Sequence, residues 1–372
     1  MSPASWPRTS SDSGSFAAGR AERRSLPAAA LPSEPVALRV LQPVERRRRR
    51  RRWPRRLLLA ALVAAAAALA VWRFDPFDRT HGARPGSAAA ARAPSRKPGA
   101  RGPLPARRPV RPLRLLTGPP ALRGHRFGPP LRAASAIVVD ARTGRVLWAL
   151  HPHKRRPIAS TTKIMTAVLT LQRLPLHRLI TVDPAATRVP LVKEGLRPRE
   201  RVRVWKLMYG LLLYSGNDDA SALAIAAGGS RREFLALMNA EARRLGLRDT
   251  HYNSPSGVLD SRNFSSAWDL AALTRYALRD PRFRRIVRTR IKRVSWSAPT
   301  YAKEYLNKNA LLGSYPGANG VKTGYTEKAG HCVVASAKRG RVELIAVVLR
   351  SGDEYGDARR LLDFGFRETG EG

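Results

Sequence analysis

Three short polar motifs follow one another along the chain, and each stands in a different local setting. They are Ser-Thr-Thr-Lys at 160–163, Ser-Gly-Asn at 215–217 and Lys-Thr-Gly at 322–324. The first lies near the start of an apolar helical pattern, the second between two apolar helical patterns, and the third in a predicted strand. Ser-x-x-Lys alone is expected about once by chance in a chain of this length. The set and its order therefore carry the signal.

Charge and apolar content divide the chain at about residue 132. Residues 1–132 hold 28 Lys and Arg against 6 acids, whereas residues 133–372 hold 41 against 21 and are dense in aliphatic side chains. The chain has a net charge of +42, and a large positive charge is common in nucleic-acid-binding proteins. The basic residues are spread along the whole chain, however, and no zinc-finger spacing or RNA-binding signature occurs. We therefore expect a cationic surface that faces anionic partners, and no nucleic acid.

The amino-terminal part has the pattern of a membrane anchor. Seven consecutive arginines at 46–52 are followed by sixteen uncharged residues at 57–72. A helix of that length spans about 24 Å, which suffices when flanking arginines extend to the membrane surface. The positive-inside rule places the arginines in the cytoplasm and the chain after residue 72 outside. Cleavage after the small-residue pattern at 68–70 is the alternative, but it would require an unusually long stretch of 56 residues before the apolar run.

The segments on either side of this anchor are low in apolar periodicity. Residues 1–45 are rich in Ser, Pro, Ala and Arg and are predicted to form a disordered cytoplasmic tail. Residues 73–132 contain twelve prolines and are predicted to form an extended linker. A basic linker of this kind suits passage through an anionic layer, although the same composition is found in simple disordered linkers. The folded domain is predicted to span residues 133–372, on the outer side of the membrane.

The folded part is predicted to be of the α+β class. Strands are expected at 136–140 and 146–148 near its beginning, and at 319–326, 331–337 and 342–349 near its end. The connections between the last three are short, which indicates antiparallel neighbours. Everything between the two groups is expected to be helical or looped. The sequence therefore predicts one sheet built from both ends of the domain, with a helical region packed against it.

The first motif combines a serine with a lysine on a helix that is expected to be buried. Ser160 and Lys163 are three residues apart, so their side chains share one helix face. Burial lowers the pKa of a lysine, and a neutral amine can accept the proton of the serine. Ser160 alone would also suit an ordinary helix cap. A cap does not explain a lysine among buried apolar positions.

The other two motifs are individually weaker. Ser215 and Asn217 occupy an interhelical turn, where such residues are common. Lys322 and Thr323 lie on a strand, and the lack of a side chain at Gly324 is expected to leave room for a ligand along it. A metal site is not indicated, because the chain has a single cysteine and no H-E-x-x-H motif. We expect no cofactor.

Three blocks around these motifs carry a family resemblance. Residues 157–167 (PIASTTKIMTA), 212–220 (LLYSGNDDA) and 315–326 (YPGANGVKTGYT) resemble serine-type D-Ala-D-Ala carboxypeptidases, the low-molecular-weight penicillin-binding proteins. Secondary matches occur at 253–257 and 265–270. The likeness covers about residues 133–368. It implies a β-lactamase/DD-peptidase-like fold of the penicilloyl-serine transferase superfamily, an extracytoplasmic location at the bacterial cell membrane, peptidoglycan stem peptides as substrate and β-lactams as inhibitors.

The resemblance also implies roles for the nucleophile and its neighbours. Ser160 would attack the carbonyl of the penultimate D-alanine, and Lys163 would accept its proton. Ser215 would relay that proton to the leaving D-alanine, while Asn217 would bind the backbone amide of the substrate.

The strand motif is assigned to substrate binding by the same resemblance. Lys322 and Thr323, followed by Gly324, would hold the terminal carboxylate. The backbone N–H groups of Ser160 and Tyr325 would form the oxyanion hole. Some family members have an arginine on the last strand that assists the carboxylate, but Arg350 is not clearly in register with it. Since the chain ends soon after Phe366, we expect no additional β-rich domain.

Two other functions share these motifs. A class A β-lactamase needs a glutamate followed four residues later by an asparagine, and no glutamate from Glu194 onward has one. A non-enzymatic peptidoglycan-binding or β-lactam-binding protein of the same fold is the second alternative. The intact Ser160, Lys163, Ser215 and Lys322 favour an enzyme.

Overall fold

A six-stranded sheet assembled from both ends of the folded part is the framework of the computed structural model. The structure describes residues 115–117, 128–258, 262–296 and 301–371. The sheet order is β1-β3-β2-β12-β11-β10, and all neighbours are antiparallel except β1 and β3. The strands are β1 (Leu116–Thr117), β2 (Ser135–Asp140), β3 (Arg145–Leu150), β10 (Ala318–Thr326), β11 (Gly330–Arg339) and β12 (Val342–Ser351). The predicted α+β class, with an antiparallel sheet that joins the early and late strands, is confirmed.

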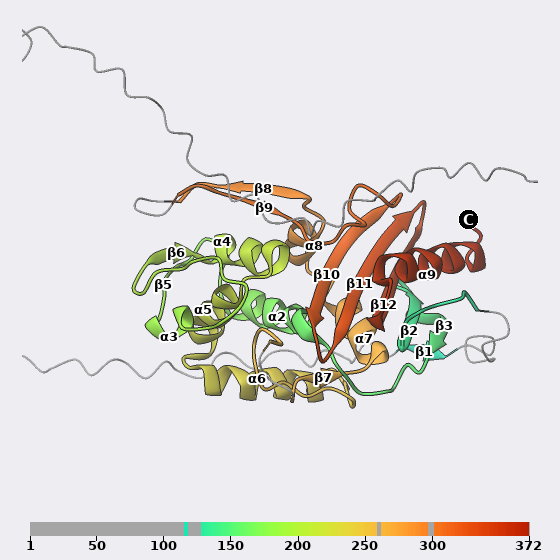
Figure 1. Cartoon of the computed structure of the whole chain (residues 1–372), viewed down its shortest axis with the longest axis horizontal. Coiled ribbons are helices and arrows are strands. Elements are labelled where there is room, and N and C mark those ends of the chain that lie inside the picture. The colour runs from blue at the N-terminus through green and yellow to red at the C-terminus, as the bar shows by residue number, and fades with distance from the viewer. Residues whose placement is uncertain (1–114, 118–127, 259–261, 297–300, 372) are drawn as a thin grey trace, which may run out of the picture. The chain divides into compact units, whose positions relative to one another are not determined.

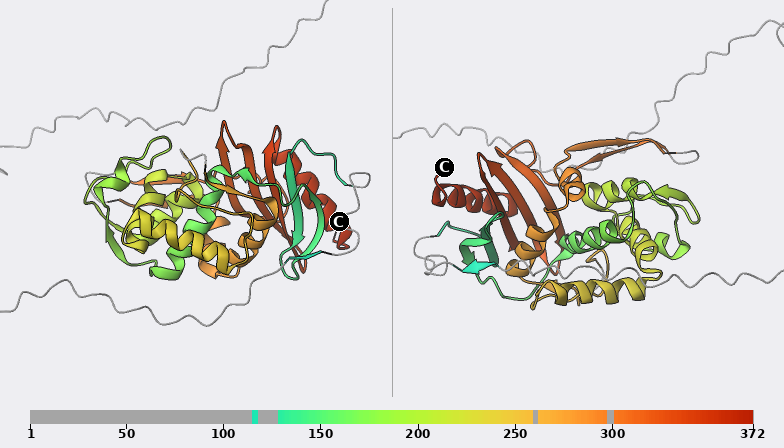
Figure 2. Two further views of the ribbon diagram at one scale, coloured as in Figure 1. Left: turned by 90° about the horizontal axis from the view of Figure 1, so that it is seen from below. Right: turned by 180° about the vertical axis from the view of Figure 1, so that it is seen from behind.

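Both faces of the sheet are covered, because successive side chains of a strand point to opposite faces. Val138 and Leu344 lie in a core with the helix α9 (Glu354–Glu368), whereas Ile137 and Ile345 lie in the larger core shared with the other helices. Figures 1 and 2 show α9 packed against one face of the sheet. The other face contacts α7, which belongs to the group of remaining helices.

The helical region surrounds one buried helix, α2 (Lys163–Arg173). Its first nine residues are all buried, as the sequence predicted. The neighbours that contact it are α5 (Asn217–Gly228), α6 (Arg231–Arg244), α7 (Ala267–Ala277) and α8 (Pro281–Val287). The short helices α3 (Pro184–Thr187) and α4 (Val204–Tyr209) complete this region. A helix buried on all sides lacks the polar stripe of a surface helix, so its lysine must have a specific environment.

Three small antiparallel pairs interrupt the region expected to be only helical or looped, and that expectation is wrong. They are β4 (Arg156–Pro157) with β7 (Phe264–Ser265), β5 (Leu179–Thr181) with β6 (Arg201–Arg203), and β8 (Ile291–Val294) with β9 (Lys303–Leu306). Each strand has only two to four residues, too few to show a period of two in the sequence.

Much of the amino-terminal prediction falls outside the described residues. The tail at 1–45, the anchor at 46–72 and most of the linker at 73–132 belong to this part. The short strand β1 lies within the stretch predicted as linker and pairs with β3. Within the described ranges, no helix is long and apolar enough to cross a membrane.

Candidate active site

Ser160, the predicted nucleophile, lies in a tight turn rather than in the helix that follows it. Ser160 belongs to the 3₁₀ turn η1 (Ala159–Thr162), and α2 begins only at Lys163. Ala159 has a left-handed backbone with φ of 45°. No side-chain cap is formed at either helix start, so the capping interpretation of Ser160 does not apply. The turn holds Ser160 against the sheet, 8% exposed.

Two glycines allow this turn to pack closely against its surroundings. A Cβ on Gly257 would lie 1.9 Å from the carbonyl oxygen of Ala159. A Cβ on Gly324 would lie 2.9 Å from the backbone nitrogen of Ser160 and 3.1 Å from the carbonyl oxygen of Ile158. Gly324 thus makes room for the turn that holds Ser160, and its predicted role toward a ligand stays a prediction.

The amine of Lys163 joins two of the three motifs. Its Nζ lies 2.9 Å from Ser160 Oγ, 2.9 Å from Asn217 Oδ1 and 3.1 Å from the carbonyl oxygen of Ser256. The amide and carbonyl oxygens can only accept hydrogen bonds, whereas the hydroxyl of Ser160 can also donate one. A neutral amine has two N–H groups and one lone pair. It can donate to Asn217 and Ser256 while its lone pair accepts from Ser160.

Burial favours that neutral form. Lys163 is completely buried. Loss of solvation is the main cause that lowers its pKa to about 7, and the charge of Lys308 lowers it further, while Asp219 and Asp218 act in the opposite direction. The geometry and the pKa agree that Lys163 can act as the base for Ser160.

The second motif is presented by an irregular helix end. The helix α4 continues as a widened π-helical turn, η2 (Gly210–Tyr214), after which Ser215 adopts φ of 73°. A left-handed backbone is unfavourable by about 1 kcal/mol or more for a non-glycine residue. Such π-turns are frequent at functional sites. The predicted interhelical turn is observed, but its unusual backbone has no signature in the sequence.

Asn217 is fixed from two sides, whereas Ser215 is not. The Asn217 side chain accepts from Lys163 and donates to the carbonyl oxygen of Pro190 at 3.1 Å. Its backbone N–H donates to the carbonyl oxygen of Val192 at 2.9 Å. Ser215 is 6% exposed, and the described residues show no hydrogen bond to its hydroxyl.

The third motif places a second buried lysine near the first. Lys322 is 1% exposed, and its Nζ donates to the carbonyl oxygen of Thr323 at 2.9 Å. Burial lowers the pKa of Lys322 well below its usual value, and the charges of Lys163 and Lys308 contribute to this shift. Mutual repulsion within the group would fall if an anion bound beside it.

Lys308 was not found by sequence reasoning. No sequence motif surrounds Lys308, and it reaches the site because the loop after β9 packs on η2. There the backbone N–H of Lys308 donates to the carbonyl oxygen of Leu213 at 3.3 Å. Its Nζ lies 5.0 Å from the centre of the Tyr214 ring. Burial lowers the pKa of Lys308. Such a residue is found only when the tertiary structure is known.

The end of β10 is more open than its middle. Thr323 is half-buried, and Tyr325 is 57% exposed, with its ring centre 4.5 Å from that of His331. Arg350 lies in a left-handed conformation beside the irregularity between β11 and β12, and it donates to the carbonyl oxygen of Lys328 at 3.4 Å. Arg350 is thus at this end of the sheet but bonded to the adjacent turn.

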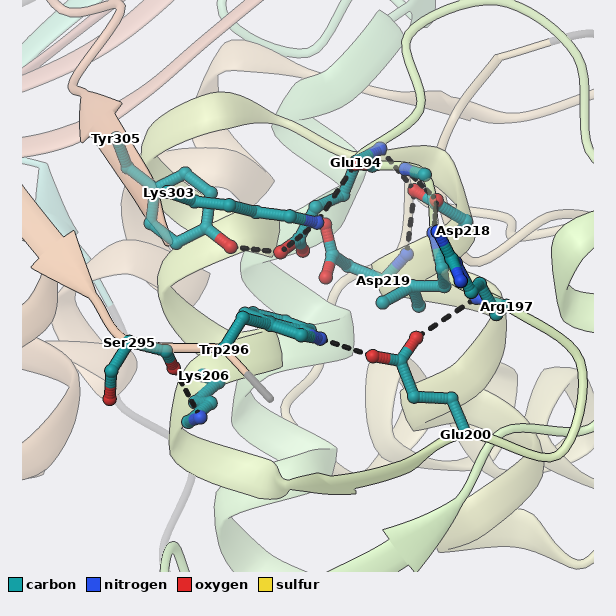
Figure 3. A network of polar contacts seen from close by, with 12 residues as sticks. Glu194, Arg197, Glu200, Lys206, Asp218, Asp219, Ser295, Trp296, Lys303 and Tyr305 are labelled. Carbon is teal, nitrogen blue, oxygen red and sulfur yellow. Dashed lines mark hydrogen bonds and ion pairs between the residues drawn. The ribbon is translucent and has the colours of Figure 1, made fainter. Parts of the chain in front are cut away.

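A network of buried acids holds the second motif in place (Figure 3). Asp218 accepts hydrogen bonds from the backbone N–H groups of Glu194, Gly195 and Leu196 at 2.8, 2.8 and 3.0 Å. These bonds attach the loop that carries Pro190 and Val192 to the start of α5. Asp218 therefore supports Asn217 indirectly.

The neighbouring carboxyl groups of Asp219 and Glu194 differ from that of Asp218 in their hydrogen bonds. Asp219 is fully buried, and neither of its carboxyl oxygens has a hydrogen-bond partner among the described residues. Glu194 pairs with Lys303 and accepts from the hydroxyl of Tyr305. Burial and the nearby negative charge of Glu194 raise the pKa of Asp219 well above its usual value. The raised pKa favours the protonated form of the Asp219 carboxyl group.

Comparison with known proteins agrees with this geometry. A model of the D-alanyl-D-alanine carboxypeptidase family matches residues 125–352, which include all three motifs. The chain belongs to this family. The family assignment predicted from the three sequence blocks is therefore confirmed.

Individual relatives of this family are similar over the same region. D-alanyl-D-alanine carboxypeptidase DacF of Bacillus subtilis is 34% identical over 251 residues, which cover 63% of this chain and 62% of that protein. The chain thus spans less than two thirds of that relative. The carboxypeptidase of Streptomyces sp. strain K15 is 33% identical over 64% of this chain and 88% of that protein.

Solved structures of family members share the fold. The crystal structure of the Streptomyces K15 DD-transpeptidase aligns with a TM-score of 0.62 and 32% identity over 65% of this chain and 99% of that chain. A D-alanyl-D-alanine carboxypeptidase from Mycobacterium tuberculosis aligns with a TM-score of 0.61 and 32% identity, over 65% and 95%. The predicted DD-peptidase fold of the described domain is confirmed.

Proposed function

We propose that the folded domain is a serine D-Ala-D-Ala carboxypeptidase, which removes the terminal D-alanine from peptidoglycan stem pentapeptides. The observation that carries this proposal is the position of Lys163 Nζ, 2.9 Å from the hydroxyl of Ser160 and completely buried. Family membership supplies the substrate class.

Acylation begins at Ser160. Its Oγ attacks the carbonyl carbon of the penultimate D-alanine while its proton passes to the neutral amine of Lys163. The backbone N–H groups of Ser160 and Tyr325 are the proposed donors to the carbonyl oxygen, where negative charge develops. Breakdown of the tetrahedral intermediate breaks the C–N bond.

The proton then reaches the leaving group. Lys163 returns it through the hydroxyl of Ser215 to the amine of the departing D-alanine, and Asn217 holds the remaining peptide. Water next attacks the ester on Ser160, with Lys163 again accepting a proton. The products are the shortened peptide and free enzyme.

Lys322 and Lys308 provide specificity for a free carboxylate. The chain terminus of the substrate would lie along β10 next to Lys322 and Thr323. Lys308 adds positive charge to the same region, as its effect on the pKa of Lys322 indicates. A peptide with an internal amide instead of a terminal carboxylate would gain none of this stabilisation.

The direct test is release of D-alanine from a pentapeptide that ends in D-Ala-D-Ala. Ser160→Ala is the matched control, because it removes only the nucleophile. A cross-linked peptide dimer distinguishes the related activity named for an Escherichia coli relative, a D-alanyl-D-alanine endopeptidase that is 33% identical over 241 residues. Cleavage of the dimer without release of terminal D-alanine would contradict the carboxypeptidase proposal.

The β-lactamase alternative requires a different fate of the acyl-enzyme. A β-lactam should acylate Ser160, but its leaving group stays tethered and no Glu–Asn pair is available from Glu194 onward to activate water. Fluorescent penicillin should therefore give an adduct on Ser160 that lasts minutes or longer on a gel and in intact-mass spectra. Rapid repeated turnover without a detectable adduct would favour a lactamase.

We propose further that residues 57–72 anchor the enzyme as a single membrane-spanning segment, with the catalytic domain on the cell-wall side. The arginines at 46–52 and the uncharged run that follows them support this topology. No nucleic acid is part of the proposed function.

A further inference from the structure

A strongly basic cavity lies apart from the candidate active site. Its volume is about 390 Å³, which is within the range of ligand pockets. Among its lining residues, Glu343 is the single acid. The basic lining residues are Arg142, Arg275, Arg279, Arg284, Lys338 and Arg341.

The cavity is at the far end of the sheet from Ser160. It lies among the β2–β3 turn, the end of α7, α8 and the β11–β12 turn. On β11, His331 pairs with Tyr325 beside the candidate active site, whereas Lys338 lies seven residues further along. At the usual rise of a strand, this separation is about 23 Å. The cavity and the acylation site are therefore separate.

Two guanidinium groups of the cavity are fixed by the fold. Arg275 donates to the carbonyl oxygens of Ala141 and Arg142 at 2.8 and 2.7 Å. Arg284 donates to Glu343 at 2.5 Å and to the carbonyl oxygen of Leu278 at 3.1 Å. Planar donors held in this way lose little conformational freedom when they bind a planar or tetrahedral oxyanion.

The side chains of the other four cations form no ion pair with an acid among the described residues, and the backbone N–H of Arg341 donates to Glu371 Oε1 at 3.5 Å. Arg142, Arg279, Lys338 and Arg341 are exposed at the cavity, and none forms an ion pair in the described ranges. The nearby acids are already engaged. Glu343 pairs with Arg284, Asp280 pairs with Arg282, and Asp140 accepts from the backbone N–H of Thr143 at 2.7 Å.

This arrangement is unfavourable without an anion. Like charges around one cavity repel each other. Burial, and after it the charge of Arg279, lower the pKa of Arg275, while the charge of Asp140 acts in the opposite direction. A bound anion converts the repulsion into attraction and can use several N–H donors at once. One carboxylate would neutralise only a small part of the positive charge around the cavity. A phosphate group offers more negative charge and more acceptor oxygens.

We propose that the cavity lined by Arg142, Arg275, Arg279, Arg284, Lys338 and Arg341 is a binding site for a phosphate-bearing ligand, such as a lipid headgroup or a phosphate-containing polymer. This site lies beyond the proposed peptidase function and does not depend on it. Its occupancy would hold the catalytic domain at a phosphate-rich surface while leaving Ser160 accessible.

The test compares two full-length variants that lose the same charge. The cavity variant is Arg142→Gln/Arg279→Gln/Arg341→Gln, whose three side chains make no ion pair in the described structure. The control variant is Arg201→Gln/Arg232→Gln/Arg367→Gln, which changes exposed residues elsewhere. Binding of tripolyphosphate is measured by titration calorimetry. The cavity variant should lose about tenfold or more in affinity, and the control variant less than about threefold.

Fluorescent penicillin should label both variants and the parent protein equally. This measurement separates a failure of the peptidase proposal from a failure of the cavity proposal. Equal losses of tripolyphosphate binding in the two variants would overturn the cavity proposal. If the triple variant is poorly folded, Arg279→Gln alone should still weaken binding, by about threefold.

A second pair of titrations identifies the source of the phosphate. Phosphatidylglycerol vesicles are compared with a glycerol phosphate oligomer. Vesicle binding that the cavity variant loses assigns the site to lipid headgroups. Binding of the oligomer that the cavity variant loses, with vesicle binding unchanged, assigns it to a phosphate polymer. Loss of neither would contradict the proposal.

Discussion

In the proposed mechanism, the amine of Lys163 acts as a base while it keeps its hydrogen bonds to Asn217 and Ser256. We expect Lys163→Arg to lower acylation by penicillin at least about a thousandfold, nearly as far as Ser160→Ala, because a guanidinium keeps its proton in a protein. The measurement is the rate of adduct formation, with thermal melting as the check on folding. Near-normal labelling of Lys163→Arg would place the base elsewhere.

The pKa of Lys163 also predicts a pH profile. Since burial lowers this pKa to about 7, the amine is mostly neutral above that pH and mostly protonated below it. The acylation rate should therefore level off above about pH 7 and fall about tenfold for each pH unit below it. Stopped-flow measurement with a fluorescent penicillin tests this profile. A rate that stays constant down to about pH 5 would exclude Lys163 as the titrating base.

Asp219 gives a separate prediction on stability. Its pKa is raised in the folded state, so its contribution is fully present below the pKa of an unfolded aspartate and is lost as the pH rises through the folded value. Asp219→Asn keeps the shape but cannot ionise. The variant should therefore gain stability relative to the parent between about pH 5 and pH 8, measured by urea unfolding.

Asp218→Asn is the matched control for that experiment. Its carboxylate accepts hydrogen bonds from three backbone N–H groups of the 194–196 loop. The substitution should therefore destabilise the protein throughout the same pH range. A difference between Asp219→Asn and the parent that does not change with pH would show that Asp219 ionises as an ordinary aspartate.

At the scale of elements, the turn η1 (Ala159–Thr162), which holds Ser160, depends on close contact with the loop that contains Gly257. Gly257 and Gly246 both have left-handed backbones, with φ of 76° and 73°. A Cβ on Gly257 would meet the carbonyl oxygen of Ala159 at 1.9 Å, whereas a Cβ on Gly246 would meet nothing within 4 Å. Gly246→Ala should cost about 1 kcal/mol of unfolding free energy, and Gly257→Ala about 3 kcal/mol or more.

Penicillin labelling provides the second measurement for this pair. Gly257→Ala should label more slowly than Gly246→Ala, because the added methyl displaces the turn that holds Ser160. Equal unfolding free energies and equal labelling rates would contradict the role given to the contact between Gly257 and Ala159.

The elements differ in how far their sequences predict them. The sheet was predictable because strands β10, β11 and β12 are long and their connections short. The buried α2 was predictable because its apolar residues leave no polar stripe. The left-handed Ser215 and the π-turn before it were not, because they arise where η2 packs against α5, α8 and β9.

The site residues show the same division. Ser160, Lys163 and Asn217 were predicted together and lie together, whereas the roles of Ser215, Lys322 and Thr323 toward a substrate stay predictions. Lys308 had no sequence signal, and Asp219 lay within the block at 212–220 without a role assigned to it. Each acquires its significance from contacts between segments far apart in the chain, and local patterns carry no information about such contacts.

At the scale of the whole molecule, positive charge serves two proposed purposes in different places. Buried lysines near Ser160 are suited to one terminal carboxylate, and the arginine-lined cavity at the far end of the sheet is suited to phosphate. An enzyme held at a cell-wall surface needs both a specific site and an attachment. A membrane anchor in the amino-terminal part would provide the permanent attachment.

The last prediction tests that anchor through its topology. External protease added to spheroplasts that express the full chain should remove the penicillin-labelled domain and leave a membrane-bound remnant containing residues 46–72. An amino-terminal tag should stay protected until detergent opens the membrane, because the arginines at 46–52 favour the cytoplasmic side. Release of a labelled domain that begins after Ala70, without added protease, would instead show that the apolar segment is a cleaved signal.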